Sequence, residues 1–254
     1  MVKPHILQIG SYPEWDQAPL DTAYTAHRYF EAEDKLAMLR EIATRGDPGA
    51  TRELIVACPK HEMISIYGAG TDGVDIVAAR ERGIHVSNTP DVLTNDVAVA
   101  RCLAAFDMDI AYTSRAPKQE GKQWTYIADP LELARHADFL FVTLAASAET
   151  RHIINRGVIE AVGPQGMIIN ISSAANIDED ALLDASESRR LGSAALDVFD
   201  GEPKLNARFL QLDNVLLQPH HASGTFETRK ATGQSMRDNL SAHFAGKPLL
   251  TPVV

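Results

Sequence analysis

The six residues GAGTDG, from Gly68 to Gly73, have the spacing G-x-G-x-x-G that occurs where a strand turns into a helix beneath a bound phosphate. The apolar run MISIYG leads into this turn, and a helical pattern follows from about Val74. Asp72 and Asp75 flank the start of that helix, so they would meet its positive end and repel a pyrophosphate. A single carboxylate can approach with less repulsion. From these residues alone, a site for a small carboxylate and a glycine turn that only packs strand against helix are equally well supported.

The elements that must position this loop alternate between short apolar strands and helices. Strands are expected in HILQIG, MISIYG, IHVSN, DIAYTS, DFLFVTL, GMIINIS, SAALDVF and NVLLQPH. Helices are expected at Ala50–Ala57, Val74–Arg82, Val97–Phe106, Arg151–Val162, Glu179–Arg189 and Thr225–Phe244. This alternation predicts an α/β fold with a mostly parallel sheet that is covered on both faces. Uninterrupted apolar runs such as FLFV are typical of strands buried on both faces.

Two junctions between these elements are unusually short. The helical pattern from Glu33 to Arg40 passes directly into the strand-like EIATRG, where a connection of roughly 2–6 residues is usual. Between the strand IHVSN and the strand that starts at Asp109, one helix capped by Thr94 uses all the intervening residues. A further strand with a glycine loop would need roughly 12–15 residues. We therefore expect the chain to lack one strand and loop at this second junction.

Composition excludes several classes of function. The 254 residues suffice for one large or two small domains, and a 45% hydrophobic content is ordinary for a soluble globular protein. The net charge of −10 disfavours nucleic acid or an anionic membrane as the main partner. No apolar run is long enough to cross a bilayer, and the first residues do not resemble a signal peptide. Cys58 and Cys102 lack metal or disulfide spacing, so free thiols in a reducing cytoplasm and no metal site are expected.

Several segments together resemble the D-isomer-specific 2-hydroxyacid dehydrogenases: GAGTDGVD, ARERGIHVSNTPDVLT, NISSAANIDEDALLDA, ALDVFDGEP and LLQPHHASGTFETR. The resemblance covers nearly the whole chain and is nearest to the glyoxylate/hydroxypyruvate reductases. It implies a flavodoxin-like substrate domain at residues 1–94 and 226–254 and a Rossmann-type cofactor domain, here shortened, at residues 95–225. It also implies NADP-dependent reduction of a small 2-keto acid by a cytoplasmic homodimer.

The resemblance assigns roles to residues of the substrate and catalytic sites. The backbone N–H groups of Ala69 and Gly70 are expected to bind the substrate carboxylate. His220 takes the position of the acid/base, and Glu202 that of the carboxylate that orients the imidazole and favours its protonated form. At the third catalytic position the family pattern N-x-x-R reads NISS here. Ser173 therefore replaces an arginine, and it cannot form a bidentate charged pair.

Residues for the cofactor are expected at the ends of the strands after the short junction. Ser114 and Arg115 end the strand DIAYTS, where NAD-preferring proteins usually carry a carboxylate. Serine and arginine suit the 2′-phosphate of NADP, so NADP is the expected cofactor and NAD the less favoured one. The other positions that the resemblance assigns to the cofactor are Leu144, Ala145, Thr150, Ile171, Ser172, Asp197 and Ser223. The phosphate-binding glycine loop of such a domain is missing from the sequence.

Two hypotheses about function follow. In the first, the protein is an NADP-dependent reductase of glyoxylate or hydroxypyruvate whose working form contains a central segment that this sequence omits. In the second, it is a shortened, catalytically inactive relative that acts as a binding or oligomerising protein, which explains both the missing loop and Ser173. A rearranged fold that uses GAGTDG as its phosphate loop is a third possibility, and Asp72 and Asp75 argue against it.

Overall fold

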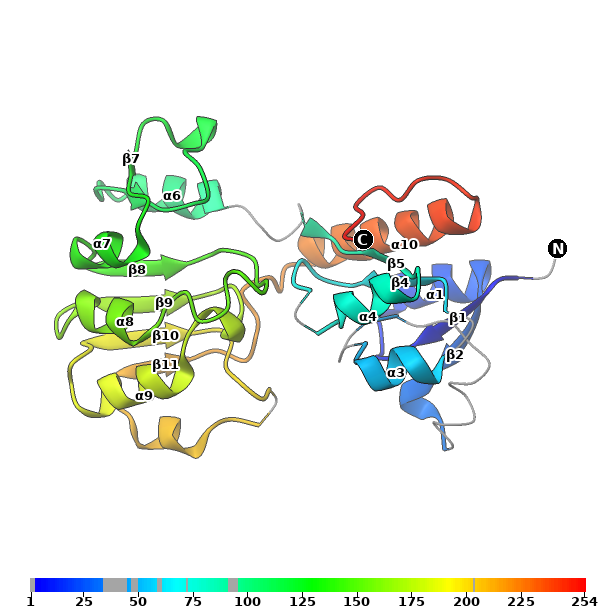
Figure 1. Cartoon of the computed structure of the whole chain (residues 1–254), viewed down its shortest axis with the longest axis horizontal. Helices are drawn as coiled ribbons and strands as arrows, with labels where there is room; N and C mark the ends of the chain where they lie inside the picture. The colour runs from blue at the N-terminus through cyan, green and yellow to red at the C-terminus, as the bar shows by residue number, and fades with distance from the viewer. Residues whose placement is uncertain are drawn as a thin grey trace. The chain divides into compact units, whose positions relative to one another are not determined.

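The chain folds into two compact units, which a computed structural model describes over residues 3–33, 45–46, 50–58, 61–71, 73–90, 96–202 and 204–254. Unit 1 comprises Met1–Leu93 and Ser223–Val254, and unit 2 comprises Thr94–Ala222 (Figure 1). Three features expected from the sequence lie wholly or largely outside the described residues: the helical run Glu33–Arg40, the cap Thr94 and Asp72. No helix in the described ranges is both long enough and apolar enough to span a bilayer.

Unit 1 contains short parallel strands in two groups. β1 (His5–Gln8) pairs with β2 (Thr25–Arg28), and β4 (Met63–Ile66) lies between β3 (Arg45–Gly46) and β5 (His85–Ser87). Because β1 also contacts β3, the order is compatible with the flavodoxin-like order 2-1-3-4-5. The helical segments of this unit are α1 (Glu14–Ala23), η1 (Tyr29–Glu31), α3 (Arg52–Ala57), α4 (Ile76–Glu81) and α10 (Phe226–Phe244).

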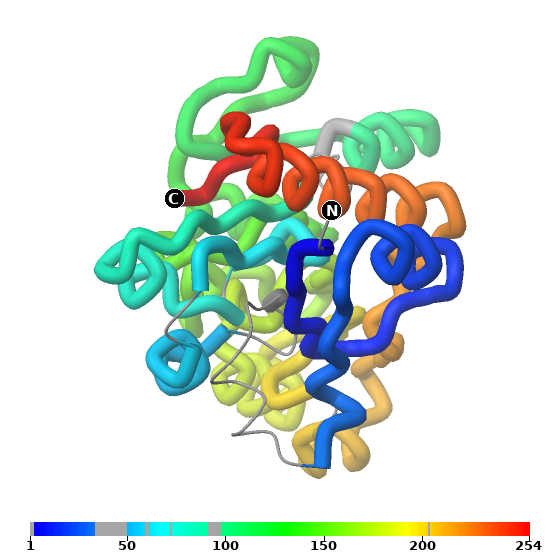
Figure 2. The backbone as a smooth tube through the Cα atoms, turned by 90° about the vertical axis from the view of Figure 1, so that its right-hand side faces the viewer, coloured from blue at the N-terminus to red at the C-terminus, as the bar shows by residue number. Residues whose placement is uncertain are grey.

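Side-chain caps fix where three helices of unit 1 begin. Thr51 caps α3, Asp75 caps α4 and Thr225 caps α10, each by accepting a backbone N–H from the first turn. The chain thus returns from unit 2 directly into α10, which packs against α1 and β4; Figure 2 shows the orange to red α10 next to the blue α1. This packing brings the starts of two helices to the end of β4, where the GAGTDG segment begins.

Unit 2 is a parallel α/β domain whose core lies between its four-stranded sheet and the helices that cover it. The strands are β6 (Ala111–Tyr112), β7 (Thr125–Tyr126), β8 (Phe139–Val142), β9 (Met167–Asn170), β10 (Ser193–Leu196) and β11 (Val215–Leu217). The helical segments are α6 (Asp96–Ala104), η2 (Gln119–Gly121), α7 (Pro130–Arg135), α8 (Arg156–Val162), η3 (Ala174–Asn176), α9 (Glu179–Glu187) and η4 (Ala207–Gln211). The runs FLFV and MIIN form adjacent strands, as their apolar sequences predict.

The sheet of unit 2 is interrupted. β8 to β11 pair in the order β11-β10-β9-β8, whereas β6 and β7 form a separate two-stranded sheet. In the doubly wound order 3-2-1-4-5-6, β7 and β6 correspond to strands 3 and 2, and β8 corresponds to strand 4. No strand in the described residues takes the place of strand 1, so β8 has an open edge and Phe139 is 49% exposed. The structure therefore agrees with the expected loss of one strand at the second short junction.

Some local predictions were wrong. The helix expected from Arg151 begins only at Arg156, because the Asn155 side chain caps it by accepting the Val158 N–H at 3.2 Å. The residues before Asn155 form a turn, in which His152 has a φ of 50°. The elements α1, β2, β7 and α7 were not expected from the sequence.

Candidate functional site

The GAGTDG segment follows β4 and is held by its carbonyl groups. The Gly68 carbonyl accepts the Thr89 N–H at 2.8 Å, and the Ala69 carbonyl accepts the Asn88 side-chain amide at 2.8 Å. Within the described part of the chain, the N–H groups of Ala69 and Gly70 donate to no other protein group. These two donors are therefore free to bind an anionic oxygen. Asn88 was not singled out from the sequence, although it fixes the loop.

The helix that follows the loop is already capped. Asp75 Oδ1 accepts the Ala78 N–H at 2.7 Å, and Asp75 Oδ2 lies 3.1 Å from Arg52 Nε. The hydrogen bond from Ala78 is the main reason why the pKa of Asp75 is lowered, and Arg52 adds to the effect. A carboxylate thus occupies the N-terminus of α4, as expected from the sequence, and a pyrophosphate would face its negative charge.

Glu202 and His220 form the contact that the resemblance implied. His220 Nδ1 lies 2.8 Å from Glu202 Oε2, while Glu202 Oε1 accepts the Phe199 N–H at 2.9 Å. The carboxylate is therefore fixed by the backbone and in turn orients the imidazole. The Nε2 atom of His220 has no protein partner among the residues described, and the side chain is more than half exposed. It is in a position to exchange a proton with a ligand.

Asp197 holds the backbone that carries His220. Its carboxylate follows β10, is 6% exposed and accepts the N–H groups of His221 at 2.6 Å and of Ala222 at 2.9 Å. His220 itself has a φ of 55°. This left-handed conformation costs a non-glycine residue roughly 1–2 kcal/mol, so it must be held by its surroundings. The two bonds to Asp197 supply that restraint directly after His220.

The NISS segment is locked by Asn170, which is buried at the end of β9. Its Oδ1 atom accepts from the Ser172 N–H at 3.0 Å and from the Ser172 hydroxyl at 2.9 Å, and its Nδ2 atom donates to the Ser173 carbonyl at 2.9 Å. The Ser173 hydroxyl accepts the Ala175 N–H at 3.3 Å and caps η3. Ser173 thus has a local structural role, and it brings no positive charge to the place of the family arginine.

The expected cofactor residues follow successive strands. Ser114 and Arg115 come after β6, then Leu144, Ala145 and Thr150 after β8, and Ile171 and Ser172 after β9. Ligands of open α/β sheets bind at these carboxyl ends. Ser223 begins the returning segment of unit 1.

Two contacts tie these loops together. The Asn176 amide donates to the Leu144 carbonyl at 2.9 Å and to the Ser172 hydroxyl at 3.0 Å. The pKa of Glu149 is lowered, chiefly by a hydrogen bond from Ser147 and in smaller part by the charge of Arg115.

A nicotinamide cofactor fits these residues only in part. Candidates exist for its adenosine end and its nicotinamide end, but not for its pyrophosphate. No two glycines between Thr94 and Ala222 have the spacing G-x-G, and the strand that should precede such a loop is missing from the described sheet. The residues present therefore do not provide the phosphate cradle of a Rossmann domain.

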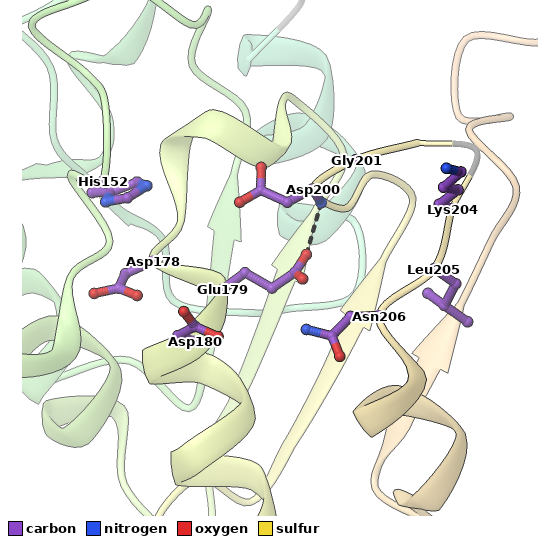
Figure 3. A pocket seen from close by; sticks show the side chains of 9 residues that line it. All are labelled: His152, Asp178, Glu179, Asp180, Asp200, Gly201, Lys204, Leu205 and Asn206. Atoms are coloured by element: carbon purple, nitrogen blue, oxygen red, sulfur yellow. Dashed lines mark hydrogen bonds between the residues drawn. The ribbon is translucent and has the colours of Figure 1, made fainter.

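Unit 2 also has an acidic pocket of about 420 Å³ (Figure 3). It is lined by His152, Asp178, Glu179, Asp180, Asp200, Gly201, Lys204, Leu205 and Asn206. Glu179 accepts the Asp200 N–H at 2.7 Å, and burial is the main reason why its pKa is raised. None of the expected catalytic or cofactor residues lines this pocket, and its carboxylates would repel a phosphate or a keto acid. No group of three or more side chains suited to a metal ion occurs in the described ranges.

Comparison with known proteins identifies the family. The family model described as "D-isomer specific 2-hydroxyacid dehydrogenase, NAD binding domain" matches residues 97–222. A hydroxyphenylpyruvate reductase of Plectranthus scutellarioides is 37% identical over 92% of this chain and 94% of the relative. The chain belongs to the D-isomer specific 2-hydroxyacid dehydrogenases. This family comprises NAD(P)-dependent 2-hydroxyacid reductases.

Other dehydrogenases of this family are also similar. A glyoxylate/hydroxypyruvate reductase of Arabidopsis thaliana is 32% identical over 92% of this chain and 94% of its own length. The crystal structure of a 2-hydroxyacid dehydrogenase from Ketogulonicigenium vulgare Y25 matches with 55% identity and a TM-score of 0.86, covering 100% of this chain and 99% of that one. An NADPH-dependent glyoxylate/hydroxypyruvate reductase from Sinorhizobium meliloti, solved with NADP and malonate, has 29% identity and a TM-score of 0.86 over 99% and 97% of the two chains.

The alignment with the Plectranthus reductase spans 295 positions, although this chain has 254 residues. The relative therefore carries residues that have no counterpart here. This difference agrees with the interrupted sheet of unit 2.

Proposed function

We propose that this dehydrogenase reduces a small 2-keto acid, glyoxylate or hydroxypyruvate, to the 2-hydroxy acid with NADPH. The observation that carries the proposal is the 2.8 Å contact between His220 Nδ1 and Glu202 Oε2, which leaves Nε2 available for proton transfer. The similarity to the reductases of Arabidopsis and Sinorhizobium supports this choice of substrate and cofactor. A homodimer in the cytoplasm is part of the same proposal.

Each group of the chain has one task in this reaction. The free N–H groups of Ala69 and Gly70 would bind the substrate carboxylate. His220 would give a proton from Nε2 to the carbonyl oxygen, and Glu202 would hold the imidazole in the required orientation. The nicotinamide, when bound, would supply the hydride. Without an arginine at position 173, the loss of a charged hydrogen bond to substrate costs roughly 1.5–3 kcal/mol, so turnover should be slow.

The choice of NADPH rests on the end of β6. Ser114 and the exposed Arg115 can bind a 2′-phosphate with charge assistance, whereas the carboxylate of an NAD-preferring site would repel it. Since no glycine loop cradles the pyrophosphate, we expect weak binding and a high KM for NADPH.

A second candidate function is favoured by the interrupted sheet and by Ser173. The chain lacks both the phosphate loop and the catalytic arginine. A catalytically inactive relative that binds or oligomerises would show both losses. Such a protein would keep Glu202 and His220 as remnants.

The loss of NADPH absorbance at saturating glyoxylate or hydroxypyruvate separates the two candidates. For the reductase, we expect measurable turnover that falls at least about 100-fold in His220→Ala, since general acid catalysis contributes 10²–10⁴-fold. His221→Ala is the matched control, because it keeps the backbone N–H that Asp197 accepts. If the unchanged protein consumes NADPH no faster than buffer does, the reductase is excluded and the inactive relative is supported.

A further inference from the structure

The tyrosine before the GAGTDG segment ties this loop to two helices of unit 1. Tyr67 lies between the end of β4 and Gly68, so its backbone is continuous with the loop. Its hydroxyl shares its proton between Asp16 Oδ2 of α1, at 3.2 Å, and the Arg229 carbonyl of α10, at 3.0 Å. One side chain therefore connects the start of the loop to both helices.

Asp16 is a fixed anchor for this hydroxyl. It is fully buried, and its other carboxylate oxygen, Oδ1, accepts a charged hydrogen bond from Arg237 of α10. A buried carboxylate needs such a partner, because an unpaired charge away from water is costly. Helix α10 carries Gly233 where it passes the carboxylate, and a Cβ atom there would overlap Asp16. Charge and close packing thus hold the Asp16 side chain in place.

The loop has further anchors on its other side. Gly68 and Ala69 are held through their carbonyl groups, which accept the Thr89 N–H and the Asn88 side-chain amide, each at 2.8 Å. Both partners follow β5, whereas Tyr67 holds the loop from α1 and α10. Two N–H donors of the loop meet no protein group in the described part of the chain. Their direction therefore depends on anchors on both sides.

We propose that Tyr67 is a positioning residue of the carboxylate-binding loop and that the buried Asp16 acts through its hydroxyl. The inference rests on the proposed function, in which Ala69 and Gly70 bind the substrate carboxylate. Misplacement of a binding group by about 1 Å can cost on the order of 100-fold. The loop would meet the carboxylate and not the carbon that receives the hydride. Loss of the anchor should therefore weaken substrate binding and spare the chemical step.

The test removes the hydroxyl of Tyr67 and keeps its ring, in Tyr67→Phe. Tyr24→Phe is the matched control, because Tyr24 belongs to the same apolar cluster and its hydroxyl lies 3.4 Å from Ser241 Oγ of α10, yet it follows α1 and is not part of the loop. Calorimetry with oxamate, which resembles a 2-keto acid but is not reduced, measures carboxylate binding without NADPH. We expect the Kd for oxamate to rise about tenfold in Tyr67→Phe and to stay within about twofold in Tyr24→Phe.

Steady-state kinetics with glyoxylate and NADPH give a second readout of the same variants. The KM for glyoxylate should rise about tenfold in Tyr67→Phe, whereas kcat should stay within about twofold, as when binding shared by ground state and transition state is lost. General weakening of the fold would not produce this separation of KM from kcat.

The role of Asp16 is tested in a variant that leaves no buried charge. Asp16→Ala with Arg237→Met removes both partners, since removal of one alone would leave the other unpaired. This variant should weaken oxamate binding about as much as Tyr67→Phe does, and adding Tyr67→Phe to it should change Kd by less than about twofold. If thermal melting shows that it does not fold, the comparison of Tyr67→Phe with Tyr24→Phe decides.

The outcomes separate this inference from the proposed reductase. Equal affinities for oxamate in Tyr67→Phe and Tyr24→Phe would overturn the inference. Failure of the unchanged protein to bind oxamate would remove the carboxylate site, and the inference with it. Weaker oxamate binding in Tyr67→Phe, in a protein that does not oxidise NADPH, would remove only the reductase. Glyoxylate turnover with the same KM in both tyrosine variants would remove only this inference.

Discussion

Asp197 accepts the backbone N–H of His221 at 2.6 Å, and its second oxygen accepts that of Ala222 at 2.9 Å. The two bonds fix the chain immediately after His220, which has a left-handed backbone. A buried carboxylate needs partners of this kind, and here the partners set the position of the proposed acid. Asp197 is thus a positioning residue for His220, whether or not it also meets the cofactor as the resemblance implies.

Replacing Asp197 by Asn should lower kcat at least about tenfold. One backbone N–H would then face an amide nitrogen, so a charged hydrogen bond worth roughly 1.5–3 kcal/mol is lost. The KM for the keto acid should change much less, since Ala69 and Gly70 belong to unit 1. Asp213→Asn, at an exposed carboxylate paired with Arg189, is the control. Unchanged kcat in Asp197→Asn would show that the two bonds do not govern His220.

The sequence predicts the elements with strong periodicity and misses those set by tertiary contacts. The run MISI formed a strand whose four residues are all buried, as its continuous apolar sequence predicts. The run FLFV also formed a strand, although Phe139 is exposed. Helix α1 was missed because EWDQAPLDTA carries a proline inside it and few apolar residues. Strand β7 was missed because only two residues pair.

The same limit applies to the candidate site. The pair Glu202 and His220 could be named from motifs, because each motif is local in sequence. The bond from Asp197 to His221 could not, since it joins residues 24 positions apart that only the folded sheet brings together. The buried Asp16, which holds Tyr67 and Arg237, gave no signal for the same reason.

Restoring the arginine of the family pattern should raise activity. In Ser173→Arg, a guanidinium can bind the substrate with two charged hydrogen bonds, and we expect kcat/KM to rise about 10- to 100-fold, as roughly 1.5–3 kcal/mol would give. Ser173→Ala is the control, because it also removes the hydroxyl that accepts the Ala175 N–H at 3.3 Å and caps η3. It should leave kcat/KM nearly unchanged. If Ser173→Arg is no more active than Ser173→Ala, residue 173 does not meet the substrate.

Inserting the missing strand and glycine loop before α6 should restore tight cofactor binding. The insert is a designed segment, a strand followed by a G-x-G-x-x-G loop, placed between β5 and α6. Its strand would pair with β6 and β8, and its loop N–H groups would meet the pyrophosphate. NADPH fluorescence should show at least about tenfold tighter binding. The same insert with its loop glycines changed to valine is the control, and equal affinities would contradict the assignment of the gap.

The two thiols should differ in reactivity. Cys58 is fully buried, and burial raises its pKa from 9.0 to about 11, whereas Cys102 is exposed. At pH 8 one thiol should react quickly with a thiol reagent, and the second only on unfolding. The folded state holds the Cys58 proton more tightly than the unfolded state does. The protonated thiol therefore contributes fully to the stability of the folded state below pH 9, and this contribution is lost as the pH rises towards 11. Fast reaction of both thiols in the native protein would contradict the burial of Cys58.

The product formed from hydroxypyruvate tests the central claim most directly. The unchanged protein is incubated with excess NADPH and hydroxypyruvate, and the glycerate is separated by chiral chromatography. We expect one D-glycerate for each NADPH consumed, and no such product from the His220→Ala variant. Glycerate of the L form, or no glycerate above the level of the His220→Ala variant, would contradict it.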